Sequence, residues 1–220
     1  EQWVADACEE LRTRPVSGTD PDQAWTRLKD VRVLKPRARG VARAVAASAG
    51  KVAEPQFQWG RLAFATGETN AGVMRVRQAI ALDPLAHEYR FELATQLLRL
   101  TTDKASRALA MDELRAIVGG AAGFEAQGRP VRYLAEVHKL LARALLKENR
   151  FAMAVPALRA ALALNSGDLD SKTELGRALY MMGKEEGIEA LRSVLRARPN
   201  DPKAALYLAL HLVREGKQSE

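Results

Sequence analysis

A phrase of six residues recurs three times along the chain. It reads AIALDP at 79–84, ALALNS at 161–166 and VLRARP at 194–199. In each copy, mostly small and apolar residues lead into Asp-Pro, Asn-Ser or Arg-Pro, and residues of these types end helices. The phrase therefore marks the end of a helix in a unit that the chain repeats. Repeated units predict an array of similar elements rather than a single closed core.

The stretch 53–86 shows what a complete unit contains. Apolar residues recur at spacings of three and four on both sides of the turn GETN at 67–70, so each side has one buried helical face. Small residues at Gly60 and Ala79 allow two helix backbones to approach closely. The unit is predicted to be an antiparallel pair of helices, helix A followed by helix B.

This layout resembles the tetratricopeptide repeat (TPR), a helix pair with a period of about 34 residues. The residues that carry the resemblance are Trp59-Gly60 in helix A, Gly72 and Ala79 in helix B, and the closing Pro84. The paired large and small residues of helix A recur in phase as Leu93-Ala94, Leu141-Ala142, Leu175-Gly176 and Leu208-Ala209.

The resemblance implies an all-α fold, a right-handed α-solenoid in which helix A lines the concave side and helix B the convex side. A single pair cannot bury its apolar stripe alone, so stacking of neighbours supplies the core. The fraction of aromatic residues is only 5%, and Ala, Leu and Arg dominate, which also favours helices. The Ala- and Arg-rich composition suggests a bacterial protein.

The register of the repeats divides the chain. We expect a diverged N-terminal repeat or helical cap at 1–52, a TPR array at 53–216 and a short tail at 217–220. Within the array, the repeats are predicted at about 53–86, 87–134, 135–168 and 169–201, followed by a C-terminal helix at 202–216. This last helix is expected to be either the first helix of a fifth pair or a solvating cap.

The second repeat is longer than the others. It spans 48 residues, and the excess over the period is placed as about one extra turn of helix B and an insertion at 119–129. The insertion contains four glycines. They predict a flexible or irregular crossover between repeats. The alternative is a flap in which Phe124 and its neighbours fold over the groove and contact a partner.

Residues that could carry catalysis or bind metal are sparse. The chain has three histidines and one cysteine, and none of the histidines has a second ligand at metal-binding spacing. Cys8 stands beside two glutamates, which raise the pKa of a thiol and make it a poor nucleophile. The sequence therefore predicts no enzyme, no metal and no cofactor.

The resemblance also implies where a partner binds, because ligand contacts in this family come mainly from the concave side of helix A. A groove of mixed arginine and apolar residues suits a peptide better than a small polar metabolite. Carried over position by position, the partner-binding residues are Phe57, Arg61, Phe64, Phe91, Thr95, Leu98, Lys139, Arg143, Leu146, Arg177 and Tyr180.

One of these positions carries arginine in three of four repeats, as Arg61, Arg143 and Arg177. These arginines lie too far along helix A for the helix N-terminus to explain them. Two interpretations stay open. They pair with acidic residues of the adjacent helix A, or they line a groove that accepts a carboxylate, a phosphate or an acidic peptide.

The leading hypothesis is a non-catalytic scaffold that binds a peptide or protein segment in the concave groove. One alternative is an accessory repeat region of a larger enzyme or of a cell-envelope assembly or secretion complex. A second is an electrostatic binder of nucleic acid or anionic surfaces, suggested by the net charge of +7. Stacking aromatic residues are too few to favour nucleic acid.

Localisation and assembly are less constrained. No apolar run approaches the roughly 20 residues of a membrane span. A chain with one cysteine forms no internal disulfide, which fits the cytoplasm or the periplasm of a bacterium. Pairing of two copies through the last helix or through 1–52 would form a homo-oligomer.

Overall fold

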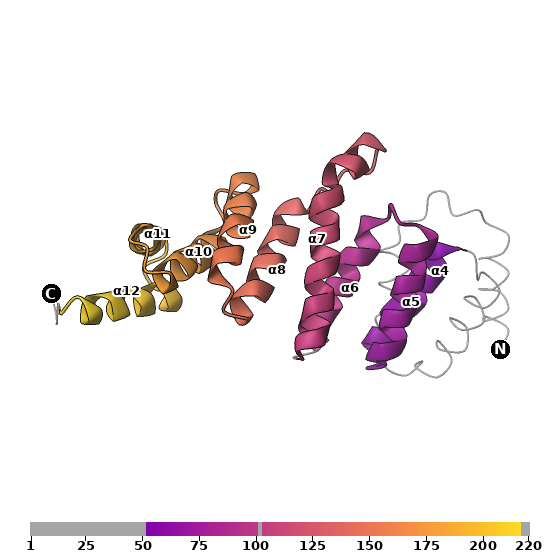
Figure 1. The fold of residues 1–220 in the computed structure, drawn as a ribbon, viewed down its shortest axis with the longest axis horizontal. Coiled ribbons are helices and arrows are strands. Elements are labelled where there is room, and N and C mark those ends of the chain that lie inside the picture. The colour runs from indigo at the N-terminus through magenta and orange to yellow at the C-terminus, as the bar shows by residue number, and fades with distance from the viewer. Residues whose placement is uncertain (1–51, 101–102, 217–220) are drawn as a thin grey trace. The chain divides into compact units, whose positions relative to one another are not determined.

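A computed structural model of the chain describes residues 52–100 and 103–216, and it is built from α-helices with no strand in those ranges (Figure 1). The expectation of an all-α fold is confirmed. The predicted N-terminal repeat or cap at 1–52, except its last residue, and the tail at 217–220 lie outside the described residues. The chain forms two compact units, Glu1–Tyr89 and Arg90–Glu220.

The described part of the first unit is one helix pair, followed by the start of a third helix. Helix α4 (Ala53–Ala65) packs along α5 (Thr69–Leu82). Tyr89, in the first turn of α6 (His87–Leu100), is buried, with its ring centroid 4.3 Å from that of Phe57. Its hydroxyl donates a hydrogen bond of 2.8 Å to Glu54, and burial together with this carboxylate raises the pKa of Tyr89.

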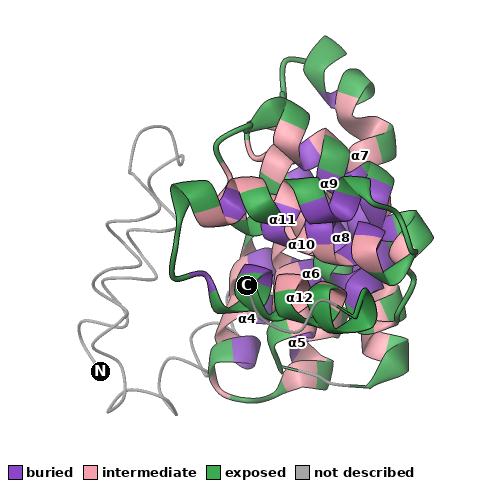
Figure 2. Ribbon diagram, turned by 90° about the vertical axis from the view of Figure 1, so that its left-hand side faces the viewer, coloured by how far each residue is buried: buried purple, intermediate pink, exposed green. Residues whose placement is uncertain are grey.

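The second unit continues α6 and adds six helices: α7 (Lys104–Ala126), α8 (Leu134–Lys147), α9 (Phe151–Leu164), α10 (Leu169–Met181), α11 (Glu186–Ala197) and α12 (Pro202–Arg214). From α7 to α12, each helix packs against the next one in sequence, and α10 also contacts α8 and α12. Figure 2 shows buried residues gathered around α8 and α9. The division into repeats stays a prediction.

Small residues hold the two helices of a pair close together. A Cβ atom added to Gly187 in α11 would lie 2.7 Å from the carbonyl oxygen of Gly176 in α10. One added to Gly60 in α4 would lie 3.1 Å from the carbonyl oxygen of Gly72 in α5. A Cβ atom 2.7 Å from a backbone oxygen would force the chain to shift, so the observed spacing requires glycine at Gly187, whereas the contact of 3.1 Å at Gly60 is tight and would need a smaller adjustment.

The turns between paired helices share one hydrogen-bond pattern. At the end of α4, the backbone nitrogen of Glu68 donates to the carbonyl of Ala63 over 2.8 Å, and Gly67 between them has φ of 83°. This is the Schellman arrangement, which needs a left-handed residue after the helix. Gly183 takes the left-handed position after α10, and Asn149 takes it after α8.

The predicted irregular crossover at 119–129 is wrong over most of its length, because α7 continues as a helix to Ala126. Gly119 and Gly123 lie within that helix, and only Gly128 is left-handed, with φ of 74°. The excess length of the second repeat is therefore mostly added helix. Phe124 is buried with its ring against Gly120 of the same helix, which does not match a flap that projects to contact a partner.

Helix α12 does not have the polar outer surface of a solvating cap. Its inner side, including Ala204 and Leu208, packs with Leu191 and Val194 of α11. Leucine and valine residues on its other side are exposed. None of the helices in the described ranges is both long and apolar enough to cross a membrane.

The glycine contacts predict opposite effects for one substitution at two sites. Gly187→Ala forces α10 and α11 apart, so the free energy of unfolding should fall by about 1–3 kcal/mol. Gly119→Ala adds a methyl group in open space within a helix, and it should raise the free energy of unfolding by about 0.4–1 kcal/mol. Urea unfolding followed by circular dichroism measures both, and a neutral Gly187→Ala would contradict the packing described for this pair.

Candidate groove of the second unit

An open pocket of about 330 Å³ lies on the helix A side of the second unit. Residues of α8, α10 and the first turn of α12 form most of its wall. Its charged lining contains equal numbers of acidic and basic side chains: Glu136, Asp170, Glu174 and Asp201, with Lys139, Arg143, Arg198 and Lys203.

Most of these charges form ion pairs that connect one helix to another. Lys203 at the start of α12 lies 2.6 Å from Glu174 in α10. Arg198, after α11, lies 2.8 Å from Asp170 in α10 and 3.2 Å from Asp201. These contacts join α10 to the start of α12 and to the segment before it, and they leave little net charge at that end of the pocket.

The junction between α9 and α10 is tied to α8 in the same way. Lys139 in α8 lies 2.9 Å from Asp168, which caps α10 by accepting hydrogen bonds from the backbone of Asp170 and Ser171. Burial opposes the ionisation of Asp168. The hydrogen bonds from Lys139 and Ser171 outweigh it and hold the pKa of this carboxyl below its ordinary value.

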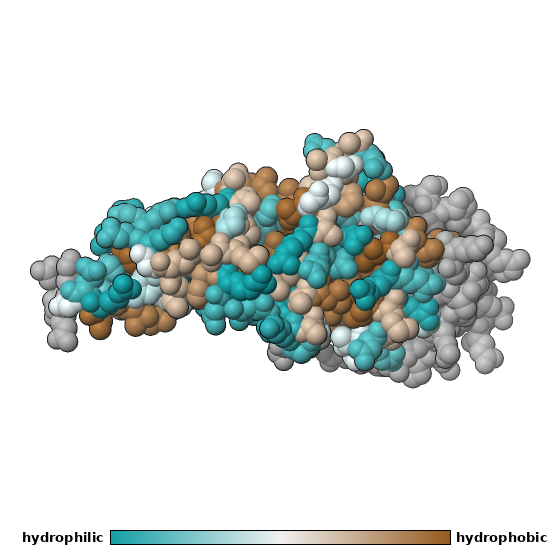
Figure 3. Space-filling model, viewed as in Figure 1, coloured by the Kyte–Doolittle hydropathy of each residue, from teal (hydrophilic) through white to brown (hydrophobic). Residues whose placement is uncertain are grey.

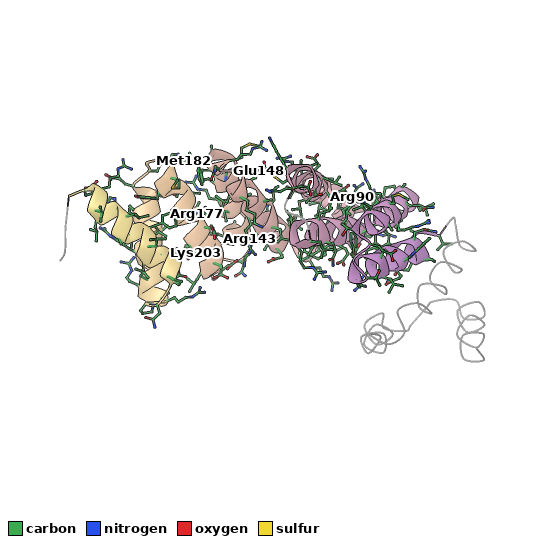
Figure 4. All side chains as sticks on the ribbon, turned by 90° about the horizontal axis from the view of Figure 1, so that it is seen from below. Arg90, Arg143, Glu148, Arg177, Met182 and Lys203 are labelled. Atoms are coloured by element: carbon green, nitrogen blue, oxygen red, sulfur yellow. The ribbon has the colours of Figure 1, made fainter. Side chains whose placement is uncertain are left out.

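Arg143 differs from the other cations of the pocket. Its side chain is exposed, and it has no hydrogen bond or ion pair with any residue that the structure describes. Glu136 in the same helix is two turns away, too far for a direct contact. Figure 4 shows Arg143, Arg177 and Lys203 on neighbouring helices. Arg143 is thus available to a carboxylate, which guanidinium groups bind with two parallel hydrogen bonds.

Aromatic side chains lie beside the charged section. Arg177 in α10 pairs with Glu174 of the same helix at 3.2 Å, and its guanidinium lies 5.9 Å from the ring centroid of Tyr207 in α12. The ring of Tyr180 lies 5.7 Å from that of Tyr207 and 6.5 Å from that of His211. All three rings are half-buried, so each keeps part of its surface exposed.

The structure brings only part of the predicted partner-binding set to a surface. Phe64 is buried against Gly72 and Leu146 is buried in α8, so neither offers a side chain to a partner. Phe57 is also buried, against Tyr89, and Arg61 lies 5.7 Å over its ring.

The predicted residues of α6 lie outside the pocket. Phe91, Thr95 and Leu98 are half-buried, and the ring centroid of Phe91 is 4.5 Å from that of Tyr133. Of the predicted set, Lys139 and Arg143 line the pocket itself, and Arg177 and Tyr180 form part of the aromatic section beside it.

Sequence reasoning missed residues at the junctions between repeats. Arg198 follows helix B and therefore lies outside helix A, and Lys203 opens α12, beyond the four repeats to which the contact positions of the family were carried over. Tyr207 directly precedes Leu208 of the large-small pair, a position from which the resemblance predicts no contact. The arginines that recur in helix A prove unlike one another, since Arg177 pairs within its own helix and Arg143 does not pair.

Within the described ranges, no group of three or more His, Cys, Asp or Glu residues is arranged to hold a metal ion. Burial lowers the pKa of His138 in α8, and the Nδ1 atom of this side chain is buried without a hydrogen-bond partner. The pocket therefore presents ion pairs, neighbouring aromatic rings, and the guanidinium of Arg143 and the exposed carboxylate of Glu136, both unpaired among the described residues, an arrangement suited to binding.

No protein-family model and no curated protein sequence matches the chain. Solved structures do match it. One is described as YrrB, a TPR protein with an unusual peptide-binding site, at 16% identity and a TM-score of 0.64, covering 81% of this chain and 85% of that one. Another is MamA from Desulfovibrio magneticus RS-1, at 18% identity and a TM-score of 0.61, covering 82% and 94%.

A further MamA structure matches at 20% identity and a TM-score of 0.62, covering 76% of this chain and 85% of that one. At such identities the likeness concerns the fold. The chain therefore has the tetratricopeptide-repeat fold that its sequence resembles, a helical solenoid.

The double role of Asp168 gives a testable consequence. Asp168→Ala removes a helix cap and an ion pair, so the free energy of unfolding should fall by about 0.5–2 kcal/mol at pH 7. Because the folded-state pKa lies below the unfolded-state value of about 3.9, the stabilisation is present above that value and is lost as the pH falls through the folded-state pKa. Urea unfolding of both proteins should show a difference that shrinks below about pH 4.

The matched control is Asp112→Ala, which removes an exposed carboxylate paired with Arg115 one turn away in α7. This change should alter stability by no more than about 0.5 kcal/mol. Equal losses in the two variants would show that Asp168 neither caps α10 nor holds it to α8.

Proposed function

We propose that the chain is a non-catalytic TPR scaffold that binds a protein segment in the groove formed by α8, α10 and α12. Arg143 carries the proposal. An exposed guanidinium that lacks a partner among the described residues lies in an open pocket whose other cations are paired. The likeness to a TPR protein with a peptide-binding site supports this use of the fold.

The ion pairs of the pocket support binding rather than catalysis. A general acid or base needs a carboxyl or imidazole group that is free to exchange a proton with a substrate. Here the carboxylates of Asp170 and Glu174 are held by Arg198, which follows α11, and by Lys203 of α12, and the carboxylate of Glu136, unpaired among the described residues, is exposed to solvent. These ion pairs hold the wall of the groove in place for a bound segment. We assign the protein to a bacterial cell, in the cytoplasm or the periplasm.

A phage-displayed library of random dodecapeptides, selected on the purified chain, tests the proposal without knowledge of the natural partner. Peptides should be enriched, and Arg143→Glu should weaken their binding by about tenfold or more, because a hydrogen bond to a charged group contributes about 1.5–3 kcal/mol. Fluorescence polarisation of the selected peptides measures the change.

The control is Arg192→Glu, which makes the same charge reversal on the exposed face of α11, where Arg192 contacts Glu189 of its own helix. Binding to this variant should match the unaltered chain, and circular dichroism should show both variants folded. Failure to enrich any peptide, or selected peptides that bind Arg143→Glu as well as they bind Arg192→Glu, would contradict the proposed groove.

A further inference from the structure

The side chains at three equivalent positions change character from one helix A to the next. Each position is counted from the Leu of the large-small pair, which is Leu141 in α8, Leu175 in α10 and Leu208 in α12. The three positions lie two residues before this Leu, two residues after it and five residues after it. In order along the array they are Lys139, Arg143 and Leu146 in α8, then Thr173, Arg177 and Tyr180 in α10, then Leu206, Leu210 and Val213 in α12.

The α12 positions form an exposed apolar stripe. Leu206 is 54% exposed, Leu210 44% and Val213 67%. Their spacings of four and three residues place them on one face of the helix. Figure 3 shows hydrophobic residues on the exposed side of α12. Contiguous exposed apolar residues of this kind mark binding surfaces more often than isolated ones do.

The other end of the same row of positions is cationic. Lys139 is neutralised by Asp168, whereas Arg143 has no partner among the described residues. Helix α10 contacts both α8 and α12, so it lies between the charged end and the apolar stripe. Tyr180 of α10 is half-buried, and its polarity is intermediate between the two ends because its ring is apolar and its hydroxyl is polar.

We propose that the groove selects a two-part segment of a partner protein, with carboxylates that bind Arg143 and apolar side chains that cover the stripe of Leu206, Leu210 and Val213. This inference rests on the proposed function and specifies its ligand. Packed helices lie 8–10 Å apart, so two steps from α8 to α12 span roughly 20 Å. An extended chain covers that distance in about six residues.

Charge also argues against a second copy of this chain as the occupant of the stripe. Lys203 and Arg214 are eleven residues apart in α12, about three turns, and therefore lie along the same edge of the stripe. In a two-fold antiparallel pair of α12 helices, the same edges meet. Arg214 would then lie against Lys203 of the second copy, a cation that is already paired with Glu174 and offers no carboxylate, whereas a partner with acidic residues beside its apolar ones would complement Arg214.

The test uses the whole chain and fluorescein-labelled synthetic peptides. The two-part peptide has four glutamates, a six-residue Gly-Ser spacer and Leu-Ala-Leu-Leu, and it is made in both orders along the chain. The acidic part alone and the apolar part alone are the reference peptides. In one of the two orders, the two-part peptide should bind at least tenfold more tightly than either reference peptide in fluorescence polarisation.

Variants assign each half of the peptide to its site. Arg143→Glu should remove the gain in affinity that the glutamates give the two-part peptide. Leu210→Glu should remove the gain in affinity that the leucines give it. Val213→Glu is a second variant of the stripe at a more exposed position. The control is Met153→Glu, which places the same charge on an exposed apolar residue of α9 and should leave binding unchanged.

Two results would overturn the inference. The first is a two-part peptide that binds no better than its halves, or that binds Leu210→Glu and Val213→Glu as tightly as the unaltered chain. If peptides from the phage selection still bind, the groove stands and only its two-part selectivity fails. The second is a dimer in sedimentation velocity that Leu210→Glu dissociates, which would assign the stripe to a second copy.

Discussion

The close approach of helix A and helix B at small residues is the contact on which the second unit depends. Gly187 lies so near Gly176 that neither position has room for a side chain, and Ala142 and Ala154 are fully buried in α8 and α9. Backbones at this distance bring the flanking leucines of both helices into contact. Each pair still leaves apolar residues uncovered, which the next pair buries, so stability is shared between neighbours.

This arrangement frees one side of each helix A from packing. At the freed positions, α8 carries Lys139 and Arg143, while α12 carries Leu206 and Leu210. Ion pairs between helices of the wall, such as Lys203 in α12 with Glu174 in α10, hold the wall together. Each exposed pair contributes only about 0–1 kcal/mol, so their main effect is to set which charges stay available. The wall with the unpaired guanidinium of Arg143 is the surface that we propose binds a partner, and the packing of the helices does not depend on that side chain.

The helices and their pairing were predictable because the large-small residues that permit close packing recur in phase. The full length of α7 was not predictable, because glycine often ends a helix but does not end this one. Gly119 and Gly123 keep helical φ values and only lower the stability of the helix. Leu146 was predicted to contact a partner but is buried. Its burial is caused by residues that are near it in space, and its position in helix A does not identify them. Ion pairs such as Lys203 with Glu174 join residues 29 positions apart, and composition alone does not select them from the other possible partners.

Native-state hydrogen exchange, followed by mass spectrometry, tests most directly the claim that each pair is sealed by its neighbours. Backbone amides of α8, α9 and α10, which have packed helices on both sides, should exchange most slowly. Those of α12, packed on one side and exposed at Leu206 and Val213, should exchange faster. Protection of α12 equal to that of α8 would contradict the account, because it would mean that the apolar stripe is already covered within a closed core.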